Sequence, residues 1–346
     1  MQPNDVIQPT AQGLFCPRGN FYIDPWRPVE RALVTHAHAD HARWGCDAYM
    51  VASEGLGVFR ARLGSEARIE TLSYGETRTI NDVNVSFHPA GHILGSAQIR
   101  LEVDGEVWVV TGDYKTGLDP TCAPYEPVRC TVMITESTFG LPVYRWPDPA
   151  VVFEAVNAWW RENAAAGLTS VVFGYALGKA QRLLAGLDAT IGPVYTHGAV
   201  EAMCEVYRAA GVSLPVTRRV ERDIRLNGSE GALVVAPPSA DDSPWMRRFQ
   251  PYATAFASGW MLVRGARRRR AVDRGFVLSD HVDWPSLLAA VEASGAERVG
   301  VTHGNAAVVA RFLNERGRTA WAIPSRYTGE NDDDSSASAE ETGGAS

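Results

Sequence analysis

Lysine, paired cysteine motifs and long apolar runs are scarce or missing in this chain of 346 residues. Its five cysteines are scattered and form no C-x-x-C pair, which excludes a disulfide framework or a cysteine zinc ribbon and favours a reducing cytoplasm. No run approaches the ~18 consecutive apolar residues of a membrane span. The first five residues carry neither a basic nor an apolar segment, so we expect no export signal and a cytoplasmic protein without membrane association.

The formal net charge of −7 is unevenly distributed along the chain. Residues 329–346 contain six acidic and no basic residues, so the rest of the chain is nearly neutral. We expect this acidic tail to be disordered, because it has few apolar residues to bury. The neutral body argues against non-specific wrapping of nucleic acid, but it allows an enzyme with a local basic groove.

The order of strand and helix patterns predicts one domain inserted in another. Residues 98–103 and 106–110 alternate around Asp104-Gly105, which indicates a β-hairpin. Ser53 is expected to begin a helix that runs to Leu63. Asp148 before Pro149 is expected to begin another helix. Strand-then-helix units follow to about residue 270 and indicate an α/β segment.

Residues 35–41 contain three histidines and one aspartate at close spacing, although histidine occurs only eight times in the chain. Neutral imidazoles and carboxylates suit zinc or a similar first-row metal and leave room for water. The candidate ligands are His36, His38, Asp40 and His41.

This stretch resembles the H-x-H-x-D-H signature of the metallo-β-lactamase superfamily. Three further matches follow from the resemblance. His92, within 91–95, resembles the third metal motif, and Asp113, within 111–114, resembles the aspartate that bridges two metals. Asp24 matches an early aspartate that supports the metal loop.

Three more motifs resemble those of the β-CASP nucleases within this superfamily. Glu136 lies in a sequence like motif A, His281 in one like motif B and His303 in one like motif C. Thr196-His197-Gly198 repeats the motif C letters, but it lies inside the insert, so we interpret His197 as a helix-capping residue. The resemblance covers residues 20–325.

The implied fold is α/β: a metallo-β-lactamase αββα sandwich with an inserted α/β β-CASP domain. The expected boundaries are 1–143 and 272–328 for the sandwich, 144–271 for the insert and 329–346 for the tail.

The resemblance also implies two divalent metal ions, zinc first and manganese as the alternative. His36, His38, His92 and Asp113 would hold one ion, and Asp40, His41, Asp113 and His303 the other. His281 would act as general acid, oriented by Glu136. Asp113 and Asp24 complete the set of implied catalytic residues.

Substrate contacts are expected on the insert. Gly178 and Lys179 lie where a strand turns into a helix and could bind a phosphate. Ser258 and Gly259 could line a pocket for a 5′ end. The basic run 267–270 is a further candidate for nucleic-acid binding.

The closest resemblance is to bacterial exonucleases associated with DNA ligase and helicase gene clusters. It implies a DNA exonuclease acting from the 5′ end in repair or end processing, with a ligase and a helicase as possible partners. A histidine at motif C is typical of RNA-processing members, so the alternative is an RNA nuclease of the ribonuclease J or cleavage-and-polyadenylation type. A second alternative is a catalytically silent nucleic-acid-binding scaffold.

Overall fold

The computed structural model describes residues 5–263, 265 and 272–325. These form two compact units, one from residues 5–145 and 281–325, the other from residues 146–280. For comparison, the insert predicted from the sequence spans 144–271. The acidic tail and the basic run 267–270 lie outside the described residues.

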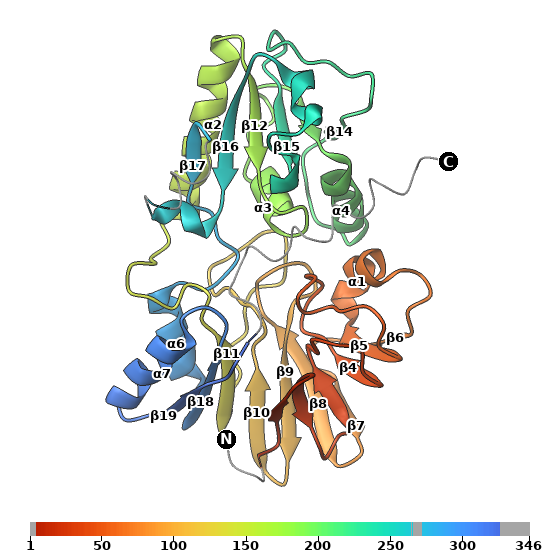
Figure 1. Ribbon diagram of the computed structural model, residues 1–346, viewed down its shortest axis with the longest axis vertical. Helices are drawn as coiled ribbons and strands as arrows, with labels where there is room; N and C mark the ends of the chain where they lie inside the picture. Colours follow the sequence, from red (N-terminus) through yellow and green to blue (C-terminus); the bar gives the residue numbers. More distant parts are fainter. Residues whose placement is uncertain (1–4, 264, 266–271, 326–346) are drawn as a thin grey trace. The chain divides into compact units, whose positions relative to one another are not determined.

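The first unit contains two β-sheets. One has the order β1-β2-β3-β4-β5-β6 and comprises Gln8–Thr10, Gly13–Cys16, Phe21–Ile23, Arg31–Leu33, Ala48–Ala52 and Ile69–Leu72. The other has the order β19-β18-β11-β10-β9-β8-β7 and comprises, in chain order from β7, Thr77–Ile80, Val83–Pro89, Ala97–Val103, Glu106–Val110, Val132–Glu136, Arg298–Thr302 and Thr319–Ala322. Helices α1 (Leu56–Leu63), α6 (Trp284–Ser294) and α7 (Ala306–Glu315) flank the sheets, as Figure 1 shows.

The two sheets face each other across a hydrophobic core. Leu33 and Met50 of the first sheet belong to the same buried cluster as Ile99, Val132 and Ile134 of the second. Successive residues of a strand point to opposite faces. Met133, between two inward residues of β11, therefore packs on the other side, in the cluster that α6 and α7 form with the sheet. The layers are thus those of an αββα sandwich.

The topology of the second sheet gathers the ends of several strands at one edge. Strands β10, β11 and β18 are parallel to one another, and β8 shares their direction because it is antiparallel to β9, which is antiparallel to β10. The loops after β8, β10 and β18 carry His92, Asp113 and His303, and Glu136 is the last residue of β11. In the first sheet the parallel strands β3 and β4 lead to Asp24 and to the histidine-rich loop.

The second unit is built on one parallel sheet of order β14-β13-β15-β12-β16-β17. In chain order from β12 the strands are Thr169–Phe173, Val194–Thr196, Thr217–Arg219, Leu233–Ala236, Tyr252–Ala257 and Arg274–Phe276. Its described helices include α2 (Pro149–Ala165), α3 (Lys179–Ala185) and α4 (Gly198–Ala209). Trp160 of α2 is fully buried, and its indole N–H donates to the carbonyl oxygen of Gly231. No helix among the described residues is long and apolar enough to cross a membrane.

The structure confirms two local predictions from the sequence and contradicts a third. The hairpin is confirmed as β9 and β10, and Asp148 caps α2 by accepting from the backbone N–H of Ala150. The expected Ser53 cap is wrong, because residues 53–55 form a 3-10 turn and α1 begins after Gly55 without a side-chain cap. Gly95 comes so close to Gly55 that a Cβ on Gly95 would lie 2.0 Å from the Gly55 Cα. This contact between the turn and the His92 loop is a tertiary feature that the cap signal does not reveal.

Candidate metal centre

Six of the eight histidines gather at the edge of the sandwich described above. The first cluster consists of His36, His38, His92 and Asp113. In it, the Nδ1 atom of His38 lies 3.1 Å from the Nε2 atoms of both His36 and His92. The Asp113 Oδ2 atom lies 3.7 Å from His36 Nε2 and 4.0 Å from His92 Nε2. Zinc–nitrogen bonds of about 2.05 Å in a tetrahedral site place ligand atoms about 3.3 Å apart. The cluster therefore has the spacing of a tetrahedral ligand set.

A second cluster shares Asp113 with the first. The Nε2 atom of His41 lies 3.5 Å from Oδ2 of Asp40 and 3.5 Å from Oδ2 of Asp113. His303 brings a ligand atom within 4.8 Å of those of His41 and Asp113, and its ring stacks on that of His41. All seven metal ligands predicted from the sequence are thus brought together in two groups joined by one carboxylate.

The charges of these groups favour a cation between them. Burial lowers the pKa of His41, but the carboxylates of Asp40 and Asp113 outweigh this effect and raise the pKa well above its ordinary value. Burial likewise raises the pKa of Asp113, but the imidazoles of His41 and His281 outweigh it and hold the pKa well below its ordinary value. The carboxylates of Asp24, Asp40 and Asp113 all lie close to His41 and favour positive charge at this place.

The hydrogen bonding supports the same fit. Asp113 Oδ1 and His41 Nε2 are buried and have no hydrogen-bond partner among the described residues. An unpaired buried polar atom is costly, and most such atoms in folded proteins are paired. Burial, followed by the neighbouring imidazoles of His41 and His92, lowers the pKa of His36 well below its ordinary value, which keeps its lone pair available. A divalent cation fits this donor set.

Asp24 holds the histidine-rich loop, residues 35–41, in place through hydrogen bonds. Its carboxylate accepts hydrogen bonds from His41 Nδ1 at 2.7 Å, from the Thr35 backbone N–H at 2.8 Å and from Thr35 Oγ1 at 2.6 Å. Because Nδ1 of His41 donates to Asp24, its Nε2 atom faces Asp40 and Asp113. The sequence did not predict this role of Thr35. Thr35 also packs closely on Gly112: a Cβ on Gly112 would lie only 2.6 Å from Thr35, so glycine is required before Asp113.

His281 is held by the carboxylate predicted to orient it. Its Nδ1 atom lies 3.0 Å from Glu136 Oε2 and 3.1 Å from Oε1, and both side chains are buried. Glu136 is itself fixed, because its Oε1 atom accepts from the backbone N–H of Tyr114 at 2.9 Å. The His281 Nδ1 atom lies 3.9 Å from Asp113 Oδ2, so the pair borders the shared carboxylate.

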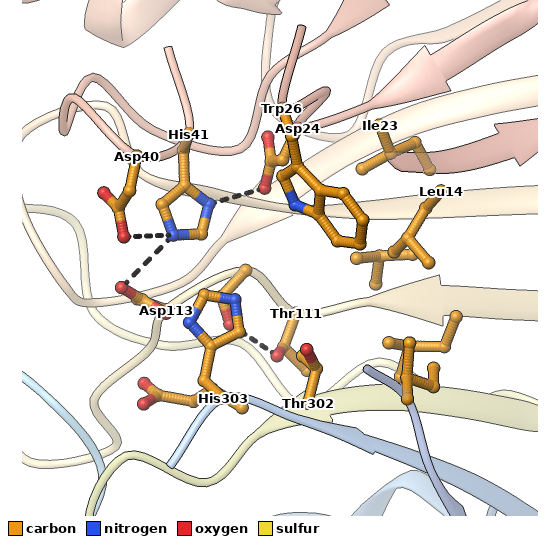
Figure 2. A pocket seen from close by; sticks show the side chains of 15 residues that line it. Leu14, Ile23, Asp24, Trp26, Asp40, His41, Thr111, Asp113, Thr302 and His303 are labelled. Carbon is orange, nitrogen blue, oxygen red and sulfur yellow. Dashed lines mark hydrogen bonds and ion pairs between the residues drawn. The ribbon is translucent and has the colours of Figure 1, made fainter. Parts of the chain in front are cut away.

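A small pocket of about 40 Å³ adjoins the second cluster. Figure 2 shows His41 between Asp24, Asp40 and Asp113, with His303 on the other side of the pocket. Leu14 and Ile23 form part of its apolar wall. The second cluster thus has a polar side, where the donor atoms gather, and an apolar side formed by the core of the sandwich.

The predicted substrate-binding residues lie in the second unit, after two neighbouring parallel strands. Gly178 has a positive φ of 85° and precedes α3, and Lys179 is 1% exposed with its Nζ atom 2.9 Å from Asp280 Oδ2. Ser258 and Gly259 follow β16, which pairs with β12, and both are buried. That Gly178, Lys179, Ser258 and Gly259 contact substrate stays a prediction.

Two further observations concern residues outside these clusters. His197 is confirmed as a capping residue, since its Nδ1 atom accepts from the backbone N–H of Ala199 at the start of α4. Ser137 was missed by the sequence analysis; its hydroxyl donates to the carbonyl oxygens of Thr302 and His303. Hydroxyls in such positions are not distinguishable from other serines in a single sequence.

Comparisons with known proteins place this geometry in context. No family model matches the chain. It is 36% identical over 316 residues to a protein named "Probable DNA ligase" from Opitutus terrae, a match that covers 90% of this chain and 30% of that protein. It is 28% identical to an "RNase J-like protein" from Methanocaldococcus jannaschii, covering 52% of this chain and 50% of that one.

One further relative and one solved structure also match the chain. The chain is 29% identical over 195 residues to "Cleavage and polyadenylation specificity factor 73" from Drosophila melanogaster, covering 49% of this chain and 27% of that protein. A crystal structure of a protein of unknown function from Enterococcus faecalis has a TM-score of 0.55, with 11% identity, and covers 86% of this chain and 80% of that one. That likeness concerns the fold alone.

The chain spans at most half the length of these three named relatives. They include β-CASP nucleases built on the metallo-β-lactamase fold, and the αββα sandwich and α/β unit described above have that architecture. The chain is a homologue of the β-CASP nucleases of the metallo-β-lactamase superfamily and has their fold.

Proposed function

We propose that the protein is a metal-dependent nuclease that hydrolyses phosphodiester bonds of DNA from the 5′ end, in repair or end processing. The observation that carries this proposal is the pair of donor clusters that share Asp113, next to the buried His281–Glu136 pair. Two cation sites joined by one carboxylate suit in-line displacement at phosphorus, because both the attacking and the leaving oxygen need stabilisation.

Each donor cluster would hold one divalent cation. His36, His38, His92 and Asp113 form the first set. His41, Asp113 and His303 form the second, and we add Asp40 to it because its Oδ2 atom lies 3.5 Å from His41 Nε2. The many imidazoles favour zinc, and the carboxylates would also accept manganese. When bound, the cations would lower the pKa of a water molecule toward neutrality and neutralise charge on the phosphate oxygens.

His281 would supply the proton for the leaving 3′-oxygen. Glu136 accepts from Nδ1 of His281, so Nε2 is the nitrogen that can carry a proton to the substrate. Glu136 is fixed in turn by the backbone N–H of Tyr114, which limits rotation of the imidazole. Asp24 would act indirectly, by directing the Nε2 atom of His41 toward the second cation.

The substrate strand would also contact the second unit. Gly178 and Lys179 follow β12, while Ser258 and Gly259 follow the neighbouring β16. Loops at the carboxyl ends of adjacent parallel strands are the usual ligand sites of α/β sheets. We propose these four residues as contacts for phosphate groups, which makes nucleic acid the principal partner.

The choice of DNA over RNA rests on the relative named "Probable DNA ligase", which matches 90% of this chain. A similar segment within a ligase-named chain favours a DNA ligase as a partner on the same DNA. A helicase would be a further partner, as the resemblance described above implies. RNA is the second candidate, because the relatives named for RNA processing and the histidine at position 303 favour it.

A single-stranded 24-mer, offered as DNA and as RNA and labelled at either end, tests the proposal with zinc and with manganese. We expect metal-dependent release of mononucleotides from the 5′ end of DNA and none from Asp113→Ala. Preferred cleavage of RNA would overturn the DNA assignment and leave the metal sites standing. If neither strand is cut, the proposed nuclease activity is wrong and a silent scaffold becomes the better reading.

A further inference from the structure

Trp44 exposes an unusually large part of its side chain. It is 71% exposed, and it lies in the loop between β4 and β5 that also carries the histidine-rich motif. Single exposed aliphatic residues are common on proteins. A tryptophan normally buries its ring, because the ring offers more apolar surface than any other side chain. An open indole ring so close to a metal-binding motif therefore calls for a role.

The ring is held in place although it is exposed. Its indole N–H donates to the carbonyl oxygen of Arg62, in the last turn of α1, at 3.0 Å. The side chain of Arg62 in turn donates through Nε to the carbonyl oxygen of Ala37 at 3.2 Å. Arg62 thus links both halves of the loop, the part between His36 and His38 and the part that bears Trp44. A ring fixed in this way loses little conformational entropy when a ligand stacks on it.

The position of Trp44 fits a strand bound for cleavage. Trp44 follows His41 by three residues, and three residues span at most about 11 Å. That distance corresponds to one or two nucleotides of an extended strand. Arg43 precedes Trp44 in the chain, and Arg62 supplies the carbonyl oxygen that the indole N–H contacts; both residues are cationic and half-buried. An aromatic platform flanked by cations is how proteins bind single-stranded nucleic acid, the cations facing phosphates and the ring a base.

We infer that Trp44 is a stacking platform for a nucleobase one or two nucleotides from the bond that is cut. The inference rests on the proposed function, which it deepens by assigning a base contact to a residue with no part in the metal site. Stacking does not distinguish bases, since every base has an aromatic face. The contact would therefore hold the strand in register for stepwise cleavage without imposing a sequence preference.

Binding of a fluorescein-labelled 24-mer, measured by anisotropy, tests the inference separately from catalysis. The parent protein and its Trp44 variants all carry Asp113→Ala, so that no strand is cut during the measurement. We expect Trp44→Ala to raise the Kd about 10-fold and Trp44→Phe to restore most of the affinity, because a smaller aromatic ring still stacks. Trp44→Leu should resemble Trp44→Ala. Val216→Ala, at an 85% exposed position in the other unit, is the matched control.

An abasic scan locates the contact. Removing one base at a time should weaken binding by the parent at one or two neighbouring positions, and these positions should become silent in Trp44→Ala. Equal Kd values for the parent and Trp44→Ala, or an abasic profile that the substitution does not change, would overturn the inference. Cleavage by the wild-type chain decides the proposed nuclease function on its own, so failure of the platform and failure of the nuclease are distinguishable. Capture of a protein partner through Trp44 without loss of strand binding would assign the ring to a protein interface and also overturn it.

Discussion

The hydroxyl of Ser137 donates hydrogen bonds to the carbonyl oxygens of Thr302 and His303. The backbone of Ser137 adds a third link, because its carbonyl oxygen accepts from the N–H of Asn305 at 3.2 Å. His303 adopts a positive φ of 57°, which few residues other than glycine favour. Ser137 thus joins the strand that ends at Glu136 to the turn that presents the His303 imidazole.

Replacing Ser137 with alanine should loosen the second donor cluster without removing a ligand. We expect Ser137→Ala to lower metal affinity about 10-fold or more at one of the two sites, because side chains that hold ligands in place typically contribute 10–100-fold. Titration of the protein with metal in a calorimeter should show a lowered affinity at one site. Ser137→Thr keeps the hydroxyl and serves as the control. Two sites weakened equally would mean that Ser137 stabilises the sandwich in general.

His281 and Glu136 give a prediction about rate. His281→Gln should lower kcat by about 10²–10⁴, the usual contribution of a general acid, while bound metal per chain stays at the wild-type level. Glu136→Gln should cost less, since the amide oxygen can still accept from Nδ1 of His281. Metal content comes from elemental analysis of the purified variants. A loss of metal in proportion to the loss of rate would make His281 a ligand and contradict the prediction.

Asp24 gives a third prediction, which separates its charge from its geometry. Asp24→Ala removes the acceptor for His41 Nδ1 and for Thr35, so we expect metal affinity to fall 10–100-fold. Asp24→Asn retains one acceptor oxygen and should show a smaller loss. Competition with a chromogenic chelator measures both variants. Identical losses would indicate that the negative charge, and not the hydrogen bonding, is what the metal loop requires.

The gathering of the candidate ligands could be predicted from the sequence because each motif places them shortly after a strand. His36, His92 and Asp113 follow strands whose alternating or apolar patterns are visible in the sequence, so their gathering at one edge follows from the topology. Side chains that support ligands from a distance could not be found in this way. Thr35 and Ser137 act through contacts between separate loops, and a hydroxyl residue has the same letter whether it supports a ligand or faces solvent.

Burial of charge was the feature hardest to predict. Lys179 at the start of a helix remains a proposed phosphate contact; the structure also buries it against Asp280, with Arg182 3.4 Å from that carboxylate, and the sequence does not indicate this burial. The partner of Lys179 is Asp280, about a hundred positions away in the chain, so the sequence near Lys179 does not indicate it. The same limit applies to Ser53: α1 begins only after Gly55, which lies close to Gly95, and a capping pattern in the sequence does not show such a contact.

Lys179→Met tests what the buried lysine does. Removing one partner of a buried ion pair typically costs about 3–5 kcal/mol of unfolding free energy, because the other charge stays buried. We expect Lys179→Met to show a loss of that order in urea unfolding. The double variant Lys179→Met/Asp280→Asn should recover part of the loss. Unchanged stability would contradict a structural role for the ion pair, and a rise in the KM for a DNA strand would support the proposed phosphate contact of Lys179.

Glu201 makes the stability of the second unit depend on pH. Its carboxylate accepts from Thr196 Oγ1 at 2.5 Å, from Arg208 Nη1 at 2.9 Å and from Thr217 Oγ1. Burial alone would raise the pKa of Glu201, but the hydrogen bonds from Thr196 and Thr217 outweigh it and lower the pKa below its ordinary value. The folded state therefore favours the charged form. The stability it contributes is present above the unfolded pKa of about 4.3 and disappears as pH falls through the lowered folded value.

Glu201→Gln should accordingly destabilise the protein by about 1–2 kcal/mol at pH 7, since hydrogen bonds to a charged acceptor are stronger than those to an amide. The difference from wild type should shrink as the pH falls below about 4, because the wild-type carboxylate then becomes neutral as well. Urea unfolding at pH 7 and at several acidic pH values measures this difference. Glu205→Gln, at an exposed position on the same helix α4, is the matched control and should have little effect at any pH. A difference between wild type and Glu201→Gln that stays constant with pH would mean that the shape of the side chain, and not its charge, holds α4 to β13 and β14.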